Sequence, residues 1–113
     1  MKYSIYSKLI GLYKPIPPGA VALVTGGDNG IGKAIAIELA KRHCYIIIVG
    51  RDQDALSSTQ QQLVKQYKIK VATIRQDLAV QDAANEVYAE VKKLGITVDV
   101  LVNNAGMAKV CIA

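Results

Sequence analysis

Four short runs of β-branched and aliphatic residues recur from Ala20 onward, and longer amphipathic stretches separate them. Apolar runs without polar alternation are typical of strands that are buried on both faces. They predict strands at Val21–Thr25, Tyr45–Val49, Val71–Arg75 and Val98–Val102. Strands that alternate with helices predict a parallel sheet with helices on its faces, and therefore an α/β fold.

The stretches between these runs repeat apolar residues with the period of a helix, about 3.6 residues. Three helix faces are predicted to point toward the sheet: Ile31, Ala34, Ile35 and Leu39; Leu56, Leu63, Val64 and Tyr67; and Ala84, Val87, Val91 and Leu94. Asp52 is expected to cap the second helix, and Gly95 to end the third in the left-handed conformation. Right-handed crossovers then predict a doubly wound sheet of the Rossmann type, with strand order 3-2-1-4 and ligands at the carboxyl ends near the reversal.

Residues 1–19 read as an N-terminal extension and Pro-rich linker, and residues 20–113 as the folded domain. The segment Pro15-Ile16-Pro17-Pro18-Gly19 breaks any regular structure. Tyrosines and Ile10 recur before it at helical spacing with lysines nearby, so contact of residues 1–14 with a membrane surface is the alternative to an extension packed on the domain. The packed extension is preferred. The apolar content is too short and interrupted for a membrane span, and no signal-peptide pattern is evident.

The composition is that of a globular protein with 51% hydrophobic and 20% charged residues, and 113 residues suit one small domain. The net charge is +5, but the basic residues are scattered and never form a run of five, so no nucleic-acid partner is expected. Cys44 and Cys111 lie far apart without metal-ligand spacing, and His43 has no second ligand in range. Neither a metal site nor a disulfide is predicted, and a reducing, cytoplasmic location fits best.

A glycine-rich segment, Thr25-Gly26-Gly27-Asp28-Asn29-Gly30-Ile31-Gly32, joins the first predicted strand to the first predicted helix. Glycine lets the backbone approach a bound phosphate closely. The free N–H groups and positive dipole end of the following helix attract an anion. The context of strand, turn and helix is the one this motif requires, so the segment predicts binding of a dinucleotide pyrophosphate.

The second predicted strand is followed by Gly50-Arg51, where a NAD-binding fold usually presents an acidic residue to the adenosine ribose. A carboxylate there would repel a 2′-phosphate, whereas a guanidinium offers it a charge-assisted, forked grip. NADP(H) is therefore favoured over NAD(H). Asp28 argues against this preference, because it places an acid in the glycine loop near the same phosphate. The alternative for Arg51 is a solvent-facing residue without a ligand.

Two further motifs end the third and fourth predicted strands, Asp77-Leu78 and Asn103-Asn104-Ala105-Gly106. Alone, each is typical of a helix cap or a turn. Taken in order with Thr25-Gly26-x-x-x-Gly30-x-Gly32 and Gly50-Arg51, they resemble the short-chain dehydrogenase/reductase family from Ala20 to about Met107.

That resemblance implies an oxidoreductase that moves a hydride between NADP(H) and a carbonyl or alcohol. It implies that Arg51 holds the 2′-phosphate, that Asp77 and Leu78 contact the adenine, and that the segment from Asn103 to Gly106 contacts the nearer ribose. The cofactor-binding residues carried over are Gly26, Asn29, Gly30, Ile31, Gly32, Arg51, Asp77, Leu78, Asn103, Ala105 and Gly106.

The resemblance stops before the family's catalytic serine and Tyr-x-x-x-Lys pair, which lie well downstream of the Asn-Asn-Ala-Gly segment. The seven residues after Gly106 contain no serine or tyrosine, so no catalytic residue is assigned. The match at Tyr88 and Lys92 falls in the third predicted helix, where Tyr88 is expected to be half-buried and Lys92 solvated. Because the missing part builds most of the family's substrate pocket, steroids, acyl thioesters, sugars and small ketones all stay open.

The fold is therefore expected to be truncated after the fourth strand, with the edge of that strand uncovered. Such an edge favours self-association or pairing with a longer relative, and predicts a marginally stable chain. The leading interpretation is the NADP(H)-binding part of an oxidoreductase. The alternative is a catalytically inactive nucleotide-binding or regulatory fragment.

Overall fold

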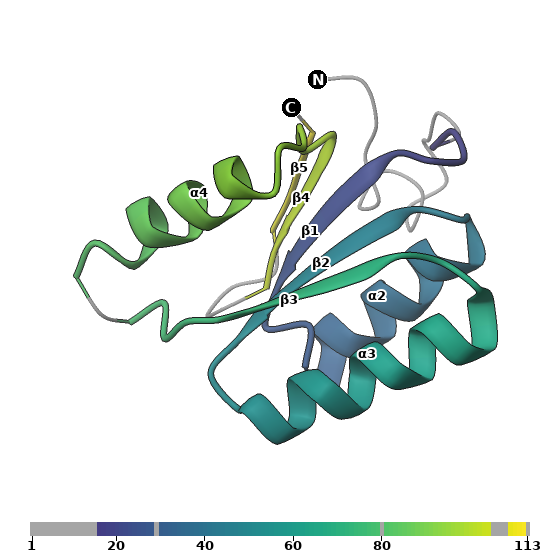
Figure 1. Cartoon of the computed structure of the whole chain (residues 1–113), viewed down its shortest axis with the longest axis horizontal. Helices are drawn as coiled ribbons and strands as arrows, with labels where there is room; N and C mark the ends of the chain where they lie inside the picture. The colour runs from purple at the N-terminus through teal and green to yellow at the C-terminus, as the bar shows by residue number, and fades with distance from the viewer. Residues whose placement is uncertain (1–15, 29, 80, 105–108, 113) are drawn as a thin grey trace.

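The computed structural model describes residues 16–28, 30–79, 81–104 and 109–112. One sheet holds the strands in the order β3-β2-β1-β4-β5. The first four are parallel neighbours: β1 (Val21–Thr25), β2 (Tyr45–Gly50), β3 (Val71–Arg75) and β4 (Val100–Asn103). The predicted strand order 3-2-1-4 and the Rossmann-type fold are confirmed, and the reversal lies between β1 and β4 (Figure 1).

The predicted uncovered edge of the fourth strand is wrong. The backbone of β5 (Lys109–Ile112) pairs antiparallel with β4, from Val100 opposite Ile112 to Asn103 opposite Lys109. The hydrogen-bonding groups along that edge of β4 therefore find partners within the same chain. The sheet therefore extends one strand beyond the predicted truncation.

The fourth strand also begins two residues later than predicted. At its start, the Asp99 side chain takes the place of a backbone carbonyl as the acceptor for Val21. Its backbone N–H donates to the Val21 carbonyl at 2.8 Å, and its carboxylate accepts from the Val21 N–H at 2.9 Å. The regular register then starts with Ala22 opposite Val100. A side-chain acceptor at the start of a strand is a tertiary feature that the apolar run does not predict.

In the described part of the chain, three helices cover the sheet: α2 (Gly30–Lys41), α3 (Gln53–Tyr67) and α4 (Ala83–Lys93). Figure 1 shows α2 and α3 on one face and α4 on the other. The first face packs into a core of alternating strand residues and helix residues, listed here: Ala22, Val24, Ile46, Ile48, Val100 and Val102 with Ala36, Leu39, Leu56 and Leu63. The second core joins Leu23, Ile47, Val49 and Ile74 to Val87 and Val91.

The predicted inner face of α2 is confirmed at Leu39, which is buried, and at Ile35, which packs against the core, and is wrong at Ile31 and Ala34. Ile31 is 67% exposed and Ala34 is also exposed, while the buried positions are Gly32, Ala36, Leu39 and Ala40. The helix is apolar nearly all round at its start, so periodicity alone does not select a face. The face is set by Gly32, which must lie against the turn that follows β1.

The other two helices agree with prediction in their central residues and differ at their flanks. Leu56, Leu63, Val87 and Val91 are buried, and Tyr67 is partly buried. The flanking predictions were wrong, because Val64, Ala84 and Leu94 are exposed. Apolar residues at the margin of a helix face point partly toward solvent instead of directly at the sheet.

The two predicted helix boundaries are confirmed. The Asp52 carboxylate accepts from the N–H groups of Asp54 at 3.0 Å and Ala55 at 3.2 Å, and so caps α3. Gly95 follows α4 with φ of 70°, and its N–H donates to the Lys92 carbonyl. By contrast Asp82, at the start of α4, has φ of 64° and its side chain makes no capping bond.

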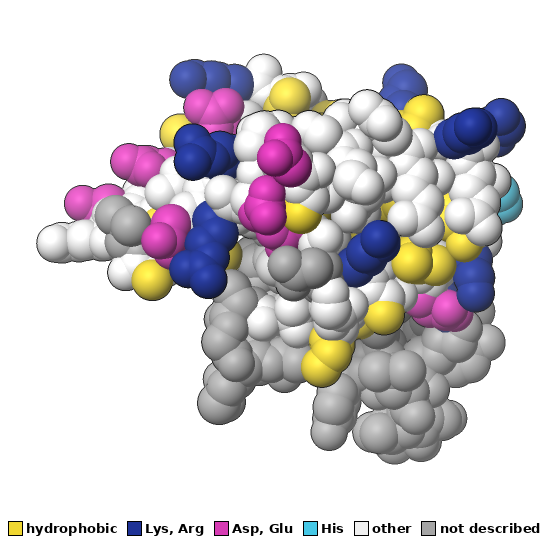
Figure 2. All heavy atoms as spheres, turned by 90° about the horizontal axis from the view of Figure 1, so that it is seen from below, with side chains coloured by type: hydrophobic (Ala, Val, Ile, Leu, Met, Phe, Trp, Pro, Cys, Tyr) yellow, Lys and Arg dark blue, Asp and Glu magenta, His cyan; other side chains and the backbone are white. Residues whose placement is uncertain are grey.

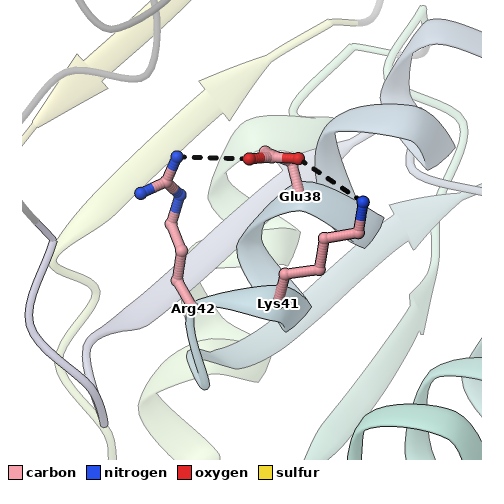
Figure 3. Close-up of polar contacts among 3 residues, drawn as sticks. All are labelled: Glu38, Lys41 and Arg42. Atoms are coloured by element: carbon pink, nitrogen blue, oxygen red, sulfur yellow. Dashed lines mark hydrogen bonds and ion pairs between the residues drawn. The ribbon is translucent and has the colours of Figure 1, made fainter.

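The carboxyl end of α2 is held by charged side chains at the edge away from the glycine loop. Glu38 accepts from Arg42 at 3.2 Å and lies 4.0 Å from the Lys41 ammonium (Figure 3). Two basic residues at a helix C-terminus also interact favourably with the helix dipole. His43 follows with φ of 60°, and its carbonyl accepts from Gly19.

The thiol of Cys44 is unreactive in this fold. Cys44 is fully buried, and burial raises the pKa of its thiol to about 11, so it is protonated and inert at neutral pH.

The surface charges are mixed. Basic and acidic side chains are interspersed on the face shown in Figure 2 rather than gathered into one basic patch. Within the described part of the chain, no helix has the length and apolar character needed to cross a bilayer.

Candidate cofactor site

The glycine loop leaves β1 in a conformation that ordinary residues rarely adopt. Gly26 has φ of 67°, and its N–H donates to the Val49 carbonyl at 2.7 Å, which ties the loop to the end of β2. Gly30 has φ of 60° and begins α2. Positive φ at both positions suits glycine alone at little cost. The loop therefore turns sharply and exposes the amino end of α2 to solvent.

Gly32 holds the first turn of α2 against the strands. A Cβ at this position would collide with the Gly26 carbonyl oxygen and lie 2.8 Å from the Asn104 amide nitrogen. Any side chain would push α2 away from the loop, and the free N–H groups of its first turn would no longer point at the same place. Gly32 thus determines how close α2 lies to the loop.

Thr25 joins the end of β1 to the end of β4. Its hydroxyl lies 3.3 Å from two acceptors, the Val102 carbonyl and the Asn103 amide oxygen, and it accepts from the Asn104 N–H at 2.9 Å. In the sequence, Thr25 is only the first residue of the glycine-rich motif. A buried hydroxyl at the end of an apolar strand was the signal that could have identified it as a structural bridge.

A cavity of about 470 Å³ opens at the carboxyl ends of β1, β2 and β3. Backbone and polar side chains line it, and its lining residues are Gly26, Asp28, Val49, Gly50, Arg51, Gln76, Asp77, Leu78, Ala79 and Asn104. A volume of about 300–1,000 Å³ with a few convergent polar groups is usual for small-molecule sites. The cavity lies where an open α/β sheet binds its ligands.

The structure brings together four of the predicted cofactor-binding residues, because Gly26, Arg51, Asp77 and Leu78 all line this cavity. Gly30, Ile31 and Gly32 form the adjoining start of α2 without lining it. Asn103 instead lines a separate groove under α4. The predicted residues Asn29, Ala105 and Gly106 lie outside the described residues.

Backbone and side-chain hydrogen bonds fix the segments that follow β2 and β3 beside the cavity. The Gln76 N–H donates to the Gly50 carbonyl at 2.8 Å, and the Asp77 carboxylate accepts from the Ala79 N–H at 3.0 Å. Arg75 donates through Nε to the Arg51 carbonyl at 3.3 Å. A second guanidinium is thereby anchored to the backbone of Arg51, and sequence reasoning missed it because Arg75 reads as the last residue of a strand.

The Tyr-x-x-x-Lys match on α4 lies apart from this cavity. The Lys92 ammonium is 5.2 Å from the centre of the Tyr88 ring, a cation–π arrangement within the helix. Both residues line a groove of about 760 Å³ between α4 and the strands β1 and β4. Lys92 is exposed as predicted, but the prediction of a half-buried Tyr88 is wrong, since that side chain is 62% exposed.

The family model described as short chain dehydrogenase matches residues 20–113, which include the glycine loop, the cavity and all five strands. The chain belongs to this family. The match agrees with the Rossmann-type strand order, in which the four motifs each follow one of the parallel strands. It makes the chain a member of a family of oxidoreductases.

Similar proteins come from distant organisms. The chain is 39% identical over 90 residues to a very-long-chain 3-oxoacyl-CoA reductase of Bos taurus, which covers 80% of this chain and 28% of that protein. The crystal structure of L-sorbose reductase from Gluconobacter frateurii, complexed with NADPH and L-sorbose, superposes with a TM-score of 0.77 at 34% identity, over 81% of this chain and 35% of that one. A Pseudomonas aeruginosa RhlG/NADP complex gives 0.70 at 34% identity, over 77% and 34%. The chain thus spans about a third of the length of the proteins it matches.

Proposed function

We propose that this chain is the NADP(H)-binding part of a short-chain dehydrogenase that transfers hydride between the nicotinamide cofactor and a carbonyl or alcohol. The observation that carries the proposal is the cavity beneath the glycine loop, which has a guanidinium at its rim and the amino end of α2 beside it. A pyrophosphate fits the helix N-terminus, because free N–H groups and the dipole both favour negative charge there. Two of the similar structures are complexes with NADPH or NADP, which supports the same cofactor class.

Arg51 is the residue we propose as the ligand of the adenosine 2′-phosphate. It is exposed at the mouth of the cavity, directly after the strand that forms the cavity floor. Arg75 donates to the Arg51 carbonyl and so holds the backbone of Arg51 in place. A guanidinium favours a phosphate dianion over a neutral hydroxyl, so Arg51 favours NADP(H) over NAD(H).

The substrate class we propose is a 3-oxoacyl thioester. The support is the name of the bovine relative, a very-long-chain 3-oxoacyl-CoA reductase, at 39% identity. We further propose that the protein works in the cytoplasm, where the buried thiol of Cys44 stays reduced. The residues described here supply the grip on the cofactor, and Tyr88 and Lys92 take no part because they line a different groove.

The test is direct titration of NADPH and NADH into the purified chain, followed by cofactor fluorescence. Arg51→Gln removes the proposed phosphate ligand and should weaken NADPH binding by roughly 10-fold to 100-fold while changing NADH binding by less than about threefold. Lys70→Ala is the matched control, since it also removes one exposed positive charge but lies before β3, at the opposite edge of the sheet. Folded chain that binds neither cofactor would overturn the proposal.

A further inference from the structure

Asp28 is an acidic residue of the glycine loop that lines the cavity and is largely buried. The residue is 8% exposed, and the remaining exposed part lies in the lining of the cavity. Its backbone carbonyl accepts from the Thr59 hydroxyl of α3 at 3.1 Å, which fixes the residue in place. The carboxylate lines the cavity, so a bound ligand can contact it.

The carboxylate lies against the end of β2. A Cβ on Gly50 would come 2.6 Å from the Asp28 carboxyl carbon and 2.7 and 2.9 Å from its two oxygens. Glycine at position 50 therefore leaves the space that the carboxylate fills. Asp28, Gly50 and Arg51 all line the same cavity, so a negative and a positive side chain flank one ligand position.

A carboxylate close to the end of the second strand is common in dinucleotide-binding folds. Many NAD-binding folds place a carboxylate after the second strand, where it accepts a hydrogen bond from an adenosine ribose hydroxyl. Here Arg51 occupies that point of the chain, and Asp28 brings a carboxylate to the same place from the glycine loop.

We propose that Asp28 determines cofactor preference by accepting a hydrogen bond from an adenosine ribose hydroxyl and opposing a 2′-phosphate, so that the cavity binds NAD(H) as well as NADP(H). The inference rests on the proposed function of the cavity. A phosphate monoester carries a charge of about −1.5 to −2 at neutral pH, so the carboxylate repels it while Arg51 attracts it. The 2′-hydroxyl of NAD(H) is a neutral donor, which the carboxylate favours.

The experiment compares the dissociation constants of NADPH and NADH for the unmodified chain and Asp28→Asn, which has the same shape without the charge. The variant should bind NADPH on the order of tenfold more tightly and NADH less tightly, so that the ratio of the two constants shifts by at least about tenfold. The shift for NADPH should shrink as salt is added, because part of it is Coulombic. Asp82→Asn is the control: it removes one charge at an exposed residue outside the cavity, and Asn tolerates the left-handed backbone there.

Asp28→Ser provides a second variant in case the amide distorts the loop, with circular dichroism as the check on folding. A ratio that stays unchanged in a folded variant, while the unmodified chain binds NADPH, would overturn the role of Asp28 and leave the proposed function intact. Absence of binding for both cofactors by the unmodified folded chain would instead overturn the proposed function itself.

Discussion

The two faces of the sheet differ in how closely they are covered. On the face under α2 and α3, the strand residues Val24, Ile46, Ile48, Val100 and Val102 have no exposed surface at all. On the opposite face, Leu101 is only partly buried, and α4 leaves a groove of about 760 Å³ lined largely by apolar residues. The well-covered face belongs to the elements that shape the glycine loop, so close packing and cofactor geometry coincide there.

The largest effect on stability is expected where α2 packs against the glycine loop. Gly32→Ala places a methyl group against the Gly26 backbone, which cannot move without opening the loop. We expect a loss of roughly 3–5 kcal/mol in the free energy of unfolding, together with loss of NADPH binding. Urea denaturation and cofactor titration measure the two effects.

Gly95→Ala is the control for that substitution. Gly95 also has positive φ, but a Cβ there would meet nothing within 4 Å. It should cost only about 1–2 kcal/mol and leave cofactor binding unchanged. Equal losses for the two variants would show that backbone conformation, rather than close approach of α2 to the loop, is what the glycines supply.

A matched pair of leucine truncations sharpens the contrast between the two faces. Leu56→Ala leaves a cavity between α3 and the sheet and should cost about 3 kcal/mol, because Leu56 is fully buried. Leu101→Ala removes a side chain that already borders the groove under α4 and should cost about 1 kcal/mol. Urea denaturation measures the free energy of unfolding of both variants. A larger loss of stability for Leu101→Ala than for Leu56→Ala would mean that the groove is closed in solution.

The smallest expected effect separates the starts of α3 and α4. Asp52→Ala removes the acceptor for two backbone N–H groups and should destabilise the chain by about 1 kcal/mol. Asp82→Ala removes no capping bond but places alanine at φ of 64°, so its comparison partner is Asp82→Gly, which should be neutral or slightly stabilising. Thermal melts of the three variants are the measurement, and a loss in Asp82→Gly as large as that in Asp52→Ala would contradict the assignment.

Much of the fold could be predicted because its signals are local. The strand at Val21–Thr25, the cap at Asp52 and the left-handed end at Gly95 each depend on a few adjacent residues, and the structure confirms them. The inner face of α2 could not be predicted in full, since Ile31 and Ala36 are both apolar and only the contact of Gly32 with the loop selects between them. The antiparallel return of β5 was missed for a related reason: a short run after a turn has no period long enough to read.

The candidate site divides in the same way. Apolar runs, glycine spacing and the residue after each strand determined, from sequence alone, a parallel sheet with a glycine loop and a basic residue at its carboxyl edge. Only the tertiary structure decided that Asp28 meets Gly50, that Thr25 bridges β1 to Asn104 of the fourth motif, and that Arg75 joins Arg51. These contacts join residues that are distant along the chain, and they exist because parallel strands deliver their carboxyl ends to one edge.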